Sequence, residues 1–596
     1  MLFNELRTRN SLLAVFIACA FTLAGCSGDD GAQGIPGEQG PQGPQGIPGS
    51  PGVPGAPGTS TDTGSGVFTT SNFEIPADAI FVADVYNELM GTELQDGADI
   101  TEALVTATFG LTSDDTVVLP QGRFLVNDSI VIFDAQRITL TGYGINETQL
   151  DFSNSVSDDA IRFEGGNTIT VRDFSVYESP KNAIKASKVN GIHFNYTGTI
   201  WEGPLESDNG AYGVYPVQSS NVIVENNYAY GSADAGIYVG QSEYIVVRNN
   251  VAKNNVAGIE IENSSYADVY NNVAIGNTGG ILVFDLPGLE KAYGKNIRIF
   301  NNELLANNAE NVGNGAVGIV PPGTGALIYA TSDVEMYNNY FKDNETTSIA
   351  LTSYFVGDSD FAKYTPSPNF PEGEHGAYVE TLIDGWSPYI KNIYIHDNEM
   401  ERSGANPRGA LLEQVITPLL PDVNMITGFT ESTSLAALGV ISDRAGETMP
   451  AILYDGVGEF VINQGMMSGF DQILAMMNPD AVADGVSYQP YTAEDAICVN
   501  NNLDTNSFAS SQEFTQTNIG MVFATDEVDL VPLVANGLWD PTSGDLPPPL
   551  FITENFHGNT ARLYCTQTRL DAAVANFDNK AFGCKGDDLA DPACSF

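Results

Sequence analysis

The stretch "NVIVENNYAYGSADAGIYVGQSEYIVVRNNVAKNNVAGIEIENSSYADVYNN", residues 221–272, repeats one pattern with a short period. "NVIVENN" is followed by "YIVVRNN" and "ADVYNN", and the motif returns as "NIRIFNN" and "DVEMYNN". The asparagine pairs of these motifs begin at Asn226, Asn249, Asn271, Asn301 and Asn338. The first steps are 22 or 23 residues long, which is too short for a propeller blade and fits one coil of a parallel β-helix. Leucine-rich repeats share this period, but their leucine signature is absent.

A second strand repeats in phase with the first. "AGIYVG", "AGIEIE" and "GGILVF" carry glycines at Gly236, Gly258 and Gly280. In the first strand, Val222 and Val224 alternate with the outward residues Ile223 and Glu225. Asparagines stacked at one turn, such as Asn226, are expected to form a ladder of side-chain hydrogen bonds. The repeat therefore predicts an all-β chain folded as a parallel β-helix, and the crossover rule predicts a right-handed one.

Residues 71–596 divide into three parts of the predicted solenoid. Residues 71–112 are predicted to cap its first edge with an amphipathic helix in "DITEALVTATFGL", which begins at Asp99. Residues 113–400 hold the β-helix repeats, and longer spacings after Pro287 predict loops inserted between coils. Residues 401–596 are expected to hold further coils ("AILYDGVGEFVIN", "AICVNNN"), an inserted helix in "GMMSGFDQILAMMNPD" and a disulfide-containing C-terminal cap.

The first 30 residues have the pattern of a bacterial export signal. Arg7 and Arg9 precede a short apolar stretch that ends in "LAGC", residues 23–26. This resembles the lipobox of bacterial lipoproteins, which predicts a signal peptide over 1–25, acylation of Cys26 and a tether over 26–30. Because Ser27 replaces the aspartate common in inner-membrane lipoproteins, the resemblance favours a lipoprotein of the outer membrane. Its folded part would face either the periplasm or the cell surface. The acyl chains are the membrane contact that we expect.

A collagen-like segment follows the tether. Glycine occupies every third position from Gly31 to Gly58, and proline often fills the third place. Only glycine fits the axis of three polyproline-II strands, so the period favours a homotrimeric stalk. A stiff monomeric linker is the alternative. Residues 59–70 are predicted to be a flexible joint in either case.

Charge and cysteine usage limit the possible partners. The net charge of −51 and the pI near 4.1 argue against nucleic acid as a ligand, because phosphates need Lys and Arg. Four cysteines remain after Cys19 and Cys26, all near the C-terminus of an exported chain. They predict two disulfides with three possible connectivities, and proximity in sequence favours Cys498–Cys565 and Cys584–Cys594.

The repeats also resemble a family of proteins. "GAYGVYPVQSSNVIVENN", "GIYVGQS", "GIEIENS" and "GGILVFDLPG" look like an uncharacterised family of exported parallel β-helix repeat proteins. That family is related to the carbohydrate-binding and sugar-hydrolase β-helices. The resemblance covers residues 80–596 and leaves the collagen-like segment outside. It implies the same fold, and it suggests a c-type cytochrome as a partner.

The in-phase strands place a column of side chains on the outer face of the solenoid. The inward positions are Val214, Ile237, Ile259 and Ile281, and the outward column is Arg162, Lys185, Tyr215, Tyr238, Glu260 and Leu282, with Gly240, Glu262 and Phe284 beside it. Exposed tyrosines near charges suit a sugar-binding groove. Lys185, Tyr215, Tyr238 and Glu260 are therefore the predicted ligand-binding residues.

The carboxylates of this face suggest two further roles. Glu260 and Glu262 alternate on one strand about 7 Å apart, which suits the acid and base of an inverting glycosidase. Glu262 and Asp285 are alternatively candidate Ca²⁺ ligands, and Ca²⁺ is the one cofactor considered. The sequence contains acids and cations but not the motifs of pectate lyases, polygalacturonases or alginate epimerases. His193, His375, His396 and His557 are scattered and none is assigned a catalytic role.

Two function classes follow from these features. The first is a non-catalytic lipoprotein that binds or scaffolds polysaccharide or a cell-surface partner. The second is a polysaccharide-active lyase, epimerase or hydrolase. The missing catalytic constellation favours the first.

Overall fold

The computed structural model describes residues 73–404 except 359, and then 406, 451–454, 458, 462, 467, 469–492, 495, 497–500, 502–504, 512–514, 520–521 and 568–584. The lipidation candidate Cys26, the collagen-like segment 31–58, Cys565, Cys594 and His557 lie outside this part of the chain. Within it, no helix is long and apolar enough to cross a membrane.

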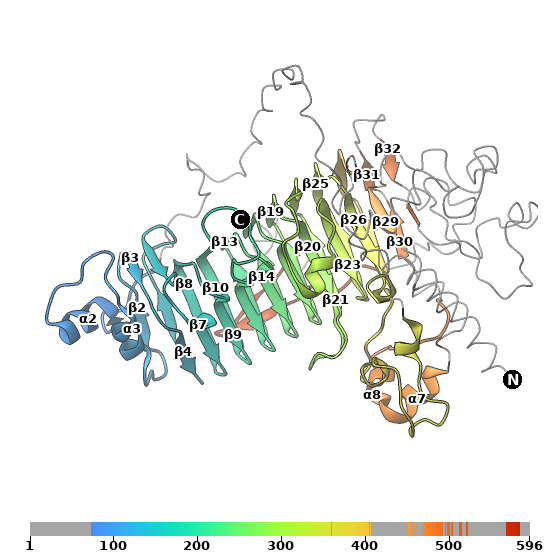
Figure 1. Ribbon diagram of the computed structural model, residues 1–596, viewed down its shortest axis with the longest axis horizontal. Coiled ribbons are helices and arrows are strands. Elements are labelled where there is room, and N and C mark those ends of the chain that lie inside the picture. The colour runs from blue at the N-terminus through green and yellow to red at the C-terminus, as the bar shows by residue number, and fades with distance from the viewer. Residues whose placement is uncertain are drawn as a thin grey trace, which may run out of the picture.

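The described strands form a parallel β-helix with three faces, as predicted (Figure 1). The first face is an 11-stranded sheet made of β4 (Ile130–Phe133), β7 (Asp159–Glu164), β9 (Asn182–Ser187), β11 (Tyr212–Val217), β14 (Ala235–Gly240), β17 (Ala257–Glu262), β20 (Gly279–Phe284), β23 (Thr324–Tyr329), β26 (Thr347–Thr352), β29 (Ile452–Tyr454) and β33 (Gly520–Met521).

The second and third faces belong to one continuous sheet, because β8 and β10 each run through both. The second face consists of β1 (Ile80–Phe81), β2 (Thr116–Val118), β5 (Thr139–Thr141), β8 (Asn167–Tyr177), β10 (Asn190–Ile200), β12 (Ser220–Glu225), β15 (Glu243–Arg248), β18 (Ser265–Tyr270), β21 (Lys295–Phe300), β24 (Val334–Tyr337), β27 (Ile393–His396) and β30 (Ile497–Asn500). The third face continues with β3 (Gly122–Leu125), β6 (Thr148–Asp151), β13 (Tyr228–Tyr230), β16 (Val251–Lys253), β19 (Val273–Ile275), β22 (Glu303–Leu305), β25 (Tyr340–Lys342), β28 (Glu399–Glu401) and β31 (Asn502–Asp504), and β32 (Gln512–Phe514) pairs antiparallel with β31.

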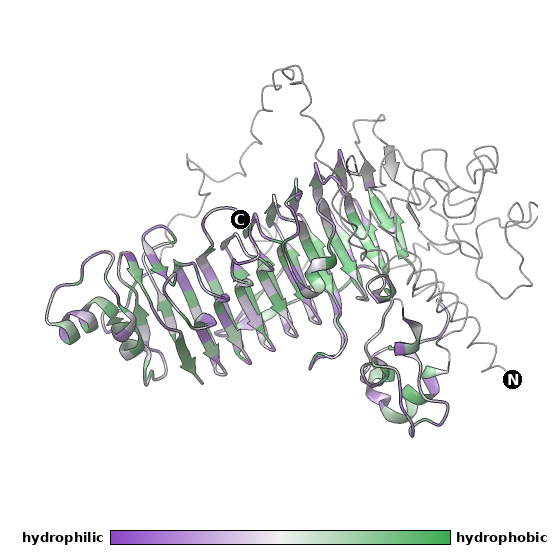
Figure 2. Ribbon diagram, viewed as in Figure 1, coloured by the Kyte–Doolittle hydropathy of each residue, from purple (hydrophilic) through white to green (hydrophobic). Residues whose placement is uncertain are grey.

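Stacked aliphatic side chains fill the solenoid. Ile237, Ile259 and Ile281 pair in register on successive coils and are completely buried, which confirms the inward column. Figure 2 shows hydrophobic and hydrophilic residues sharing the strands, as expected when one side of each strand faces the core.

Two helices lie at the N-terminal end of the solenoid (Figure 1). The predicted capping helix is α3 (Thr101–Thr108), and the Asp99 carboxylate accepts a hydrogen bond from the Thr101 N–H at 2.9 Å. Its residues Ala103 and Leu104 are completely buried in the main core. A further helix, α2 (Val82–Met90), precedes it and was not predicted from the sequence.

The predicted loops after Pro287 carry short helices of their own. The described ones are η1 (Gly315–Ile319), η2 (Tyr354–Val356), η3 (Phe361–Tyr364) and α4 (Val379–Ile383). The helix predicted near Phe470 is α7 (Phe470–Met477), and α8 (Pro479–Ala483) follows it. Trp386, Tyr389 and Tyr488 form a second core with α4 and α7, which protrudes from the side of the late coils (Figure 1).

The asparagine ladder exists, but the second residue of each pair forms it. The backbone N–H and side-chain amide of Asn250 both donate to Asn272 Oδ1, at 3.0 and 2.9 Å, and each following rung repeats the pattern. The rungs are Asn227, Asn250, Asn272, Asn302, Asn339, Asn398 and Asn502. The first residue, such as Asn226 with φ 59°, instead takes the left-handed turn that asparagine tolerates.

A second ladder at another corner explains the repeated glycines. It runs through Asn255, Asn277, Asn307 and Asn344. A Cβ on Gly258 would lie 2.6 Å from the Gly280 carbonyl oxygen and 2.9 Å from the Asn277 amide. Only glycine therefore allows the backbone to approach this ladder so closely.

Residues 568–584, which we call the strap, cross the second face. They form a hairpin of β34 (Ala575–Phe577) and β35 (Lys580–Phe582), and β34 lies against β10, β12 and β15. This part of the expected C-terminal cap therefore lies along the middle of the solenoid and not over its end. Cys498 and Cys584 are each disulfide-bonded, and the favoured pairing stays a prediction.

Candidate functional site

The register of the first face brings the predicted site residues together. Lys185 pairs with Tyr215, Tyr238 with Glu260, and Gly240 with Glu262. Stacked strands lie about 4.8 Å apart, so the outward column is continuous across the coils, as predicted.

The expected exposure of this column is wrong. Tyr238, Glu260 and Glu262 are only 4%, 2% and 7% exposed. Val317 and Val320 belong to residues 311–320, which we call the covering segment, and they pack in one hydrophobic cluster with Tyr238. Lys185 and Tyr215 are half-buried.

Three tyrosines form the aromatic part of the cluster. The ring centroids of Tyr212 lie 4.6 Å from those of both Tyr215 and Tyr238, which are 5.0 Å apart. The Lys185 ammonium lies 5.3 Å from the centroid of the Tyr215 ring, within cation–π range. The tyrosines thus pack mainly against one another, leaving Lys185 and Tyr215 at the accessible end.

Three carboxyl groups lie beside the tyrosines. The Tyr238 hydroxyl donates to Glu262 Oε1, and the Tyr212 side chain is hydrogen-bonded to Asp234. Glu260 Oε2 and Asp234 Oδ1 are buried without a hydrogen-bond partner. Burial raises the pKa of Asp234 to about 7 and that of Glu262 to about 6, and it raises the pKa of Glu260 well above its usual value. The cluster therefore holds protons near neutral pH, since closely spaced buried carboxyls cannot all ionise.

The candidate Ca²⁺ ligands have partners within the chain. Both carboxylate oxygens of Asp285 accept from the Gly294 N–H, at 3.0 and 2.9 Å, and burial raises the pKa of Asp285. Among the described residues, no three or more His, Cys, Asp or Glu side chains are grouped to hold a metal ion. The Ca²⁺ role of Glu262 and Asp285 stays a prediction.

A ladder of charges that was not predicted from the sequence lies between the second face and the strap. Glu225 lies 2.9 Å from His193 and 2.6 Å from Arg248, and Asp268 pairs with Arg298. Burial acts to raise the pKa of Glu225, but His193 and Arg248 together lower it to about 2. The predicted outward positions Ile223 and Glu225 are buried because the strap covers them.

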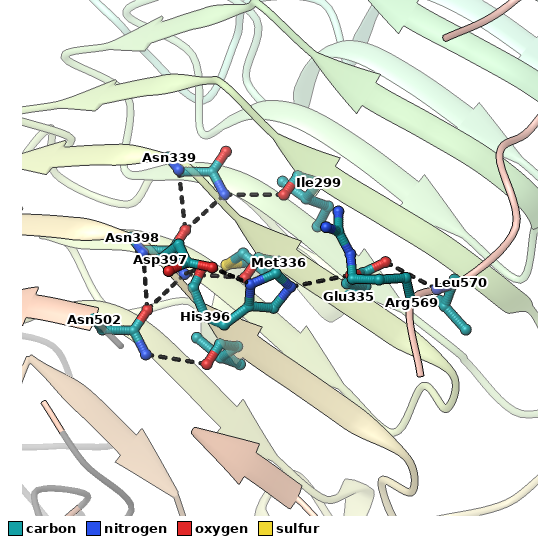
Figure 3. A network of polar contacts seen from close by, with 11 residues as sticks. Ile299, Glu335, Met336, Asn339, His396, Asp397, Asn398, Asn502, Arg569 and Leu570 are labelled. Atoms are coloured by element: carbon teal, nitrogen blue, oxygen red, sulfur yellow. Dashed lines mark hydrogen bonds and ion pairs between the residues drawn. The ribbon is translucent and has the colours of Figure 1, made fainter. Parts of the chain in front are cut away.

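The same ladder ends at His396, as Figure 3 shows. His396 Nε2 lies 3.0 Å from Glu335 Oε1, and Arg569 of the strap also contacts this carboxylate. Glu335 is completely buried, and it accepts a further hydrogen bond from the Leu570 N–H at 3.0 Å. These charges hold the strap in place. Their regular recurrence on successive strands was the signal available in the sequence.

Comparison with known proteins agrees with this architecture. Residues 128–290 match the family described as "Right handed beta helix region". This part of the chain is a right-handed parallel β-helix. No curated protein matches the sequence.

Solved structures with a similar fold have diverse functions. The A-module of a mannuronan C-5 epimerase from Azotobacter vinelandii is 16% identical, with a TM-score of 0.35, over 55% of this chain and 89% of that one. The catalytic unit of an α-1,3-glucanase from Streptomyces thermodiastaticus is 17% identical, with a TM-score of 0.34, over 65% and 52%. A surface adhesin of Streptococcus pneumoniae is 11% identical, with a TM-score of 0.36, over 54% and 85%. At these identities and TM-scores, the likeness carries no argument about the function of this chain.

Proposed function

We propose that the protein is a non-catalytic polysaccharide-binding lipoprotein of the bacterial outer membrane. In this proposal, acylated Cys26 anchors the chain, the segment from Gly31 to Gly58 holds the β-helix away from the membrane, and the solenoid supplies a long rigid surface. A trimeric stalk and a cytochrome partner stay predictions.

The burial of the candidate catalytic carboxyls carries the proposal. A general acid or base must come within hydrogen-bond distance of the proton that it transfers. Glu260 and Glu262 are nearly inaccessible, so a polymer resting on the described surface does not reach them. The first face therefore favours binding over turnover.

A glycan array with the full-length chain in detergent, followed by product analysis on each bound polysaccharide, tests the proposal. We expect binding without change of the polysaccharide. Turnover that is lost in Glu260→Gln would instead establish the enzyme alternative. Failure to bind every glycan would refute the polysaccharide part of the proposal.

A further inference from the structure

Two tyrosines form a parallel pair at the edge of the second face. Tyr244 on β15 and Tyr266 on β18 occupy the same position in neighbouring coils, because Glu243 pairs with Ser265 and Ile245 with Ala267. Their ring centroids lie 5.4 Å apart with an angle of 8° between the planes. Tyr244 is 40% exposed and Tyr266 is half-buried. The pair is thus an aromatic stack accessible to solvent.

The backbone makes these tyrosines costly. Tyr244 and Tyr266 have φ of 57° and 56°, in the left-handed region that an aromatic residue rarely adopts. The equivalent turn of the other coils carries Arg137 and Thr168, then Gly191 and Asn221 before the pair, and Asn296, Asp333 and Asn392 after it. Among these coils, Tyr244 and Tyr266 are the aromatic residues at the turn. Such strain is concentrated at ligand sites, so an adjacent aromatic pair there points to a function that needs the rings.

A pocket opens beside the stack. Its volume is about 400 Å³, and it is lined by Asn221, Tyr244, Tyr266, Ala572, Ala573, Val574 and Asn576. This volume is in the usual range for small-molecule sites. The strap supplies one wall, which is tied to the coil by the hydrogen bond from the Asn576 N–H to Asn221 Oδ1 at 2.8 Å.

The lining indicates the chemistry of the ligand. None of the described residues that line the pocket has a charged side chain, and the net charge of −51 disfavours a polyanion. The Asn576 side-chain amide, which can donate and accept hydrogen bonds, stands beside two flat aromatic rings. The Asn221 amide is already bonded to Asn190 Oδ1 and to the Asn576 N–H. A pyranose presents both an apolar ring face and hydroxyl groups, so it matches this combination.

We propose that a hexopyranose ring of a neutral glycan binds in this pocket and extends the Tyr244–Tyr266 stack over Asn221, the shorter side chain of the preceding coil. The inference rests on the proposed function, since it names the binding site and the ligand class. The stack ends at Tyr244 on this side, and the pocket spans both Tyr244 and Asn221.

The test uses the full-length chain in detergent with immobilised neutral glucans and mannans, and with a polyuronate for comparison. Tyr244→Asn and Tyr266→Asn install the residue that neighbouring coils carry at this turn. We expect each variant to bind the neutral glycan about tenfold more weakly while its melting temperature stays equal or rises, because asparagine relieves the backbone strain. Tyr244→Phe, which keeps the ring, should bind within about threefold of the parent.

A second tyrosine stack provides a matched control. Tyr228 and Tyr230 on the third face lie 6.3 Å apart with an angle of 12°, so Tyr230→Asn should leave glycan affinity unchanged. A parent that binds no glycan would refute the proposed function. If the parent binds a neutral glycan and both Tyr244→Asn and Tyr266→Asn bind it equally well, this site alone is refuted. Loss of folding in both asparagine variants would show that the rings are structural, and binding of the polyuronate only would refute the neutral class.

Discussion

Replacing Asn272 by alanine tests how much the asparagine ladder stabilises the solenoid. Asn272 is 1% exposed and lies in the middle of the ladder. Its Oδ1 accepts from the N–H and side-chain amide of Asn250, and its amide donates to the Val247 carbonyl and to Asn302 Oδ1, both at 3.0 Å. Alanine removes all four hydrogen bonds and leaves the Asn250 N–H and the Val247 carbonyl buried without these partners.

The hydrogen bonds set the expected magnitude. Each contributes about 0.5–1.5 kcal/mol net, so Asn272→Ala should lower the free energy of unfolding by about 4 kcal/mol. Asn271 is the matched control, because it precedes Asn272 directly but takes the left-handed turn with φ 54°. Glycine adopts this conformation without strain, so Asn271→Gly should change the free energy by less than about 0.5 kcal/mol.

The assay is guanidinium denaturation of the full-length chain in a compatible detergent, followed by circular dichroism. Hydrogen exchange of the Asn250 amide provides a local readout. We expect a large drop in the midpoint and faster exchange for Asn272→Ala only. If Asn272→Ala shifts the midpoint no more than Asn271→Gly, the ladder does not stabilise the fold in the way argued above.

Three other predictions concern charge and anchoring. Burial raises the pKa of Glu262 from 4.5 to about 6, so this group contributes stability fully below pH 4.5 and loses it as the pH rises through 6. Glu262→Gln should therefore stabilise the chain by about 2 kcal/mol at pH 8 and leave its stability unchanged at pH 4. Thermal melting of parent and variant at both pH values measures this, and an equal change in melting temperature at the two pH values would contradict it. Asp268→Asn should cost about 3–5 kcal/mol because it leaves the Arg298 charge buried, and adding Arg298→Met should restore stability in denaturant titrations. Cys26→Ser should move the protein from the membrane to the soluble fraction on cell fractionation; retention in the membrane would refute acylation as the anchor.

The sequence predicted the solenoid well because its signals are local and periodic. The spacing of the asparagine pairs gave the coil length, and the in-phase glycines gave the register of Tyr238 with Glu260. The role of each asparagine was assigned to the wrong member of the pair, because the pattern does not say which residue takes positive φ. Helix α2 was missed since it adds no repeat.

The segments that cover the first and second faces could not be predicted in the same way. The covering segment and the strap have no periodicity, and their partners lie far away in the chain, as with Arg569 and Glu335. The sequence therefore did not reveal that Glu260 on the first face is almost completely buried. Aligning the coils on the turn before each second-face strand would have revealed Tyr244 and Tyr266 as an adjacent aromatic pair in a column of mostly polar and glycine residues.

The length of the strap limits how many coils can lie between its two points of attachment. Between Arg569 and Asn576, the strap connects Glu335 on β24 to Asn221 on β12, which are four coil steps apart. Four steps cover about 19 Å, and the seven-residue advance reaches at most about 25 Å when extended. Duplication of one coil in this interval would stretch the strap almost fully, and duplication of two would detach it. This tether makes the number of coils in the middle of the solenoid a fixed property of the protein, although the repeats share one backbone pattern.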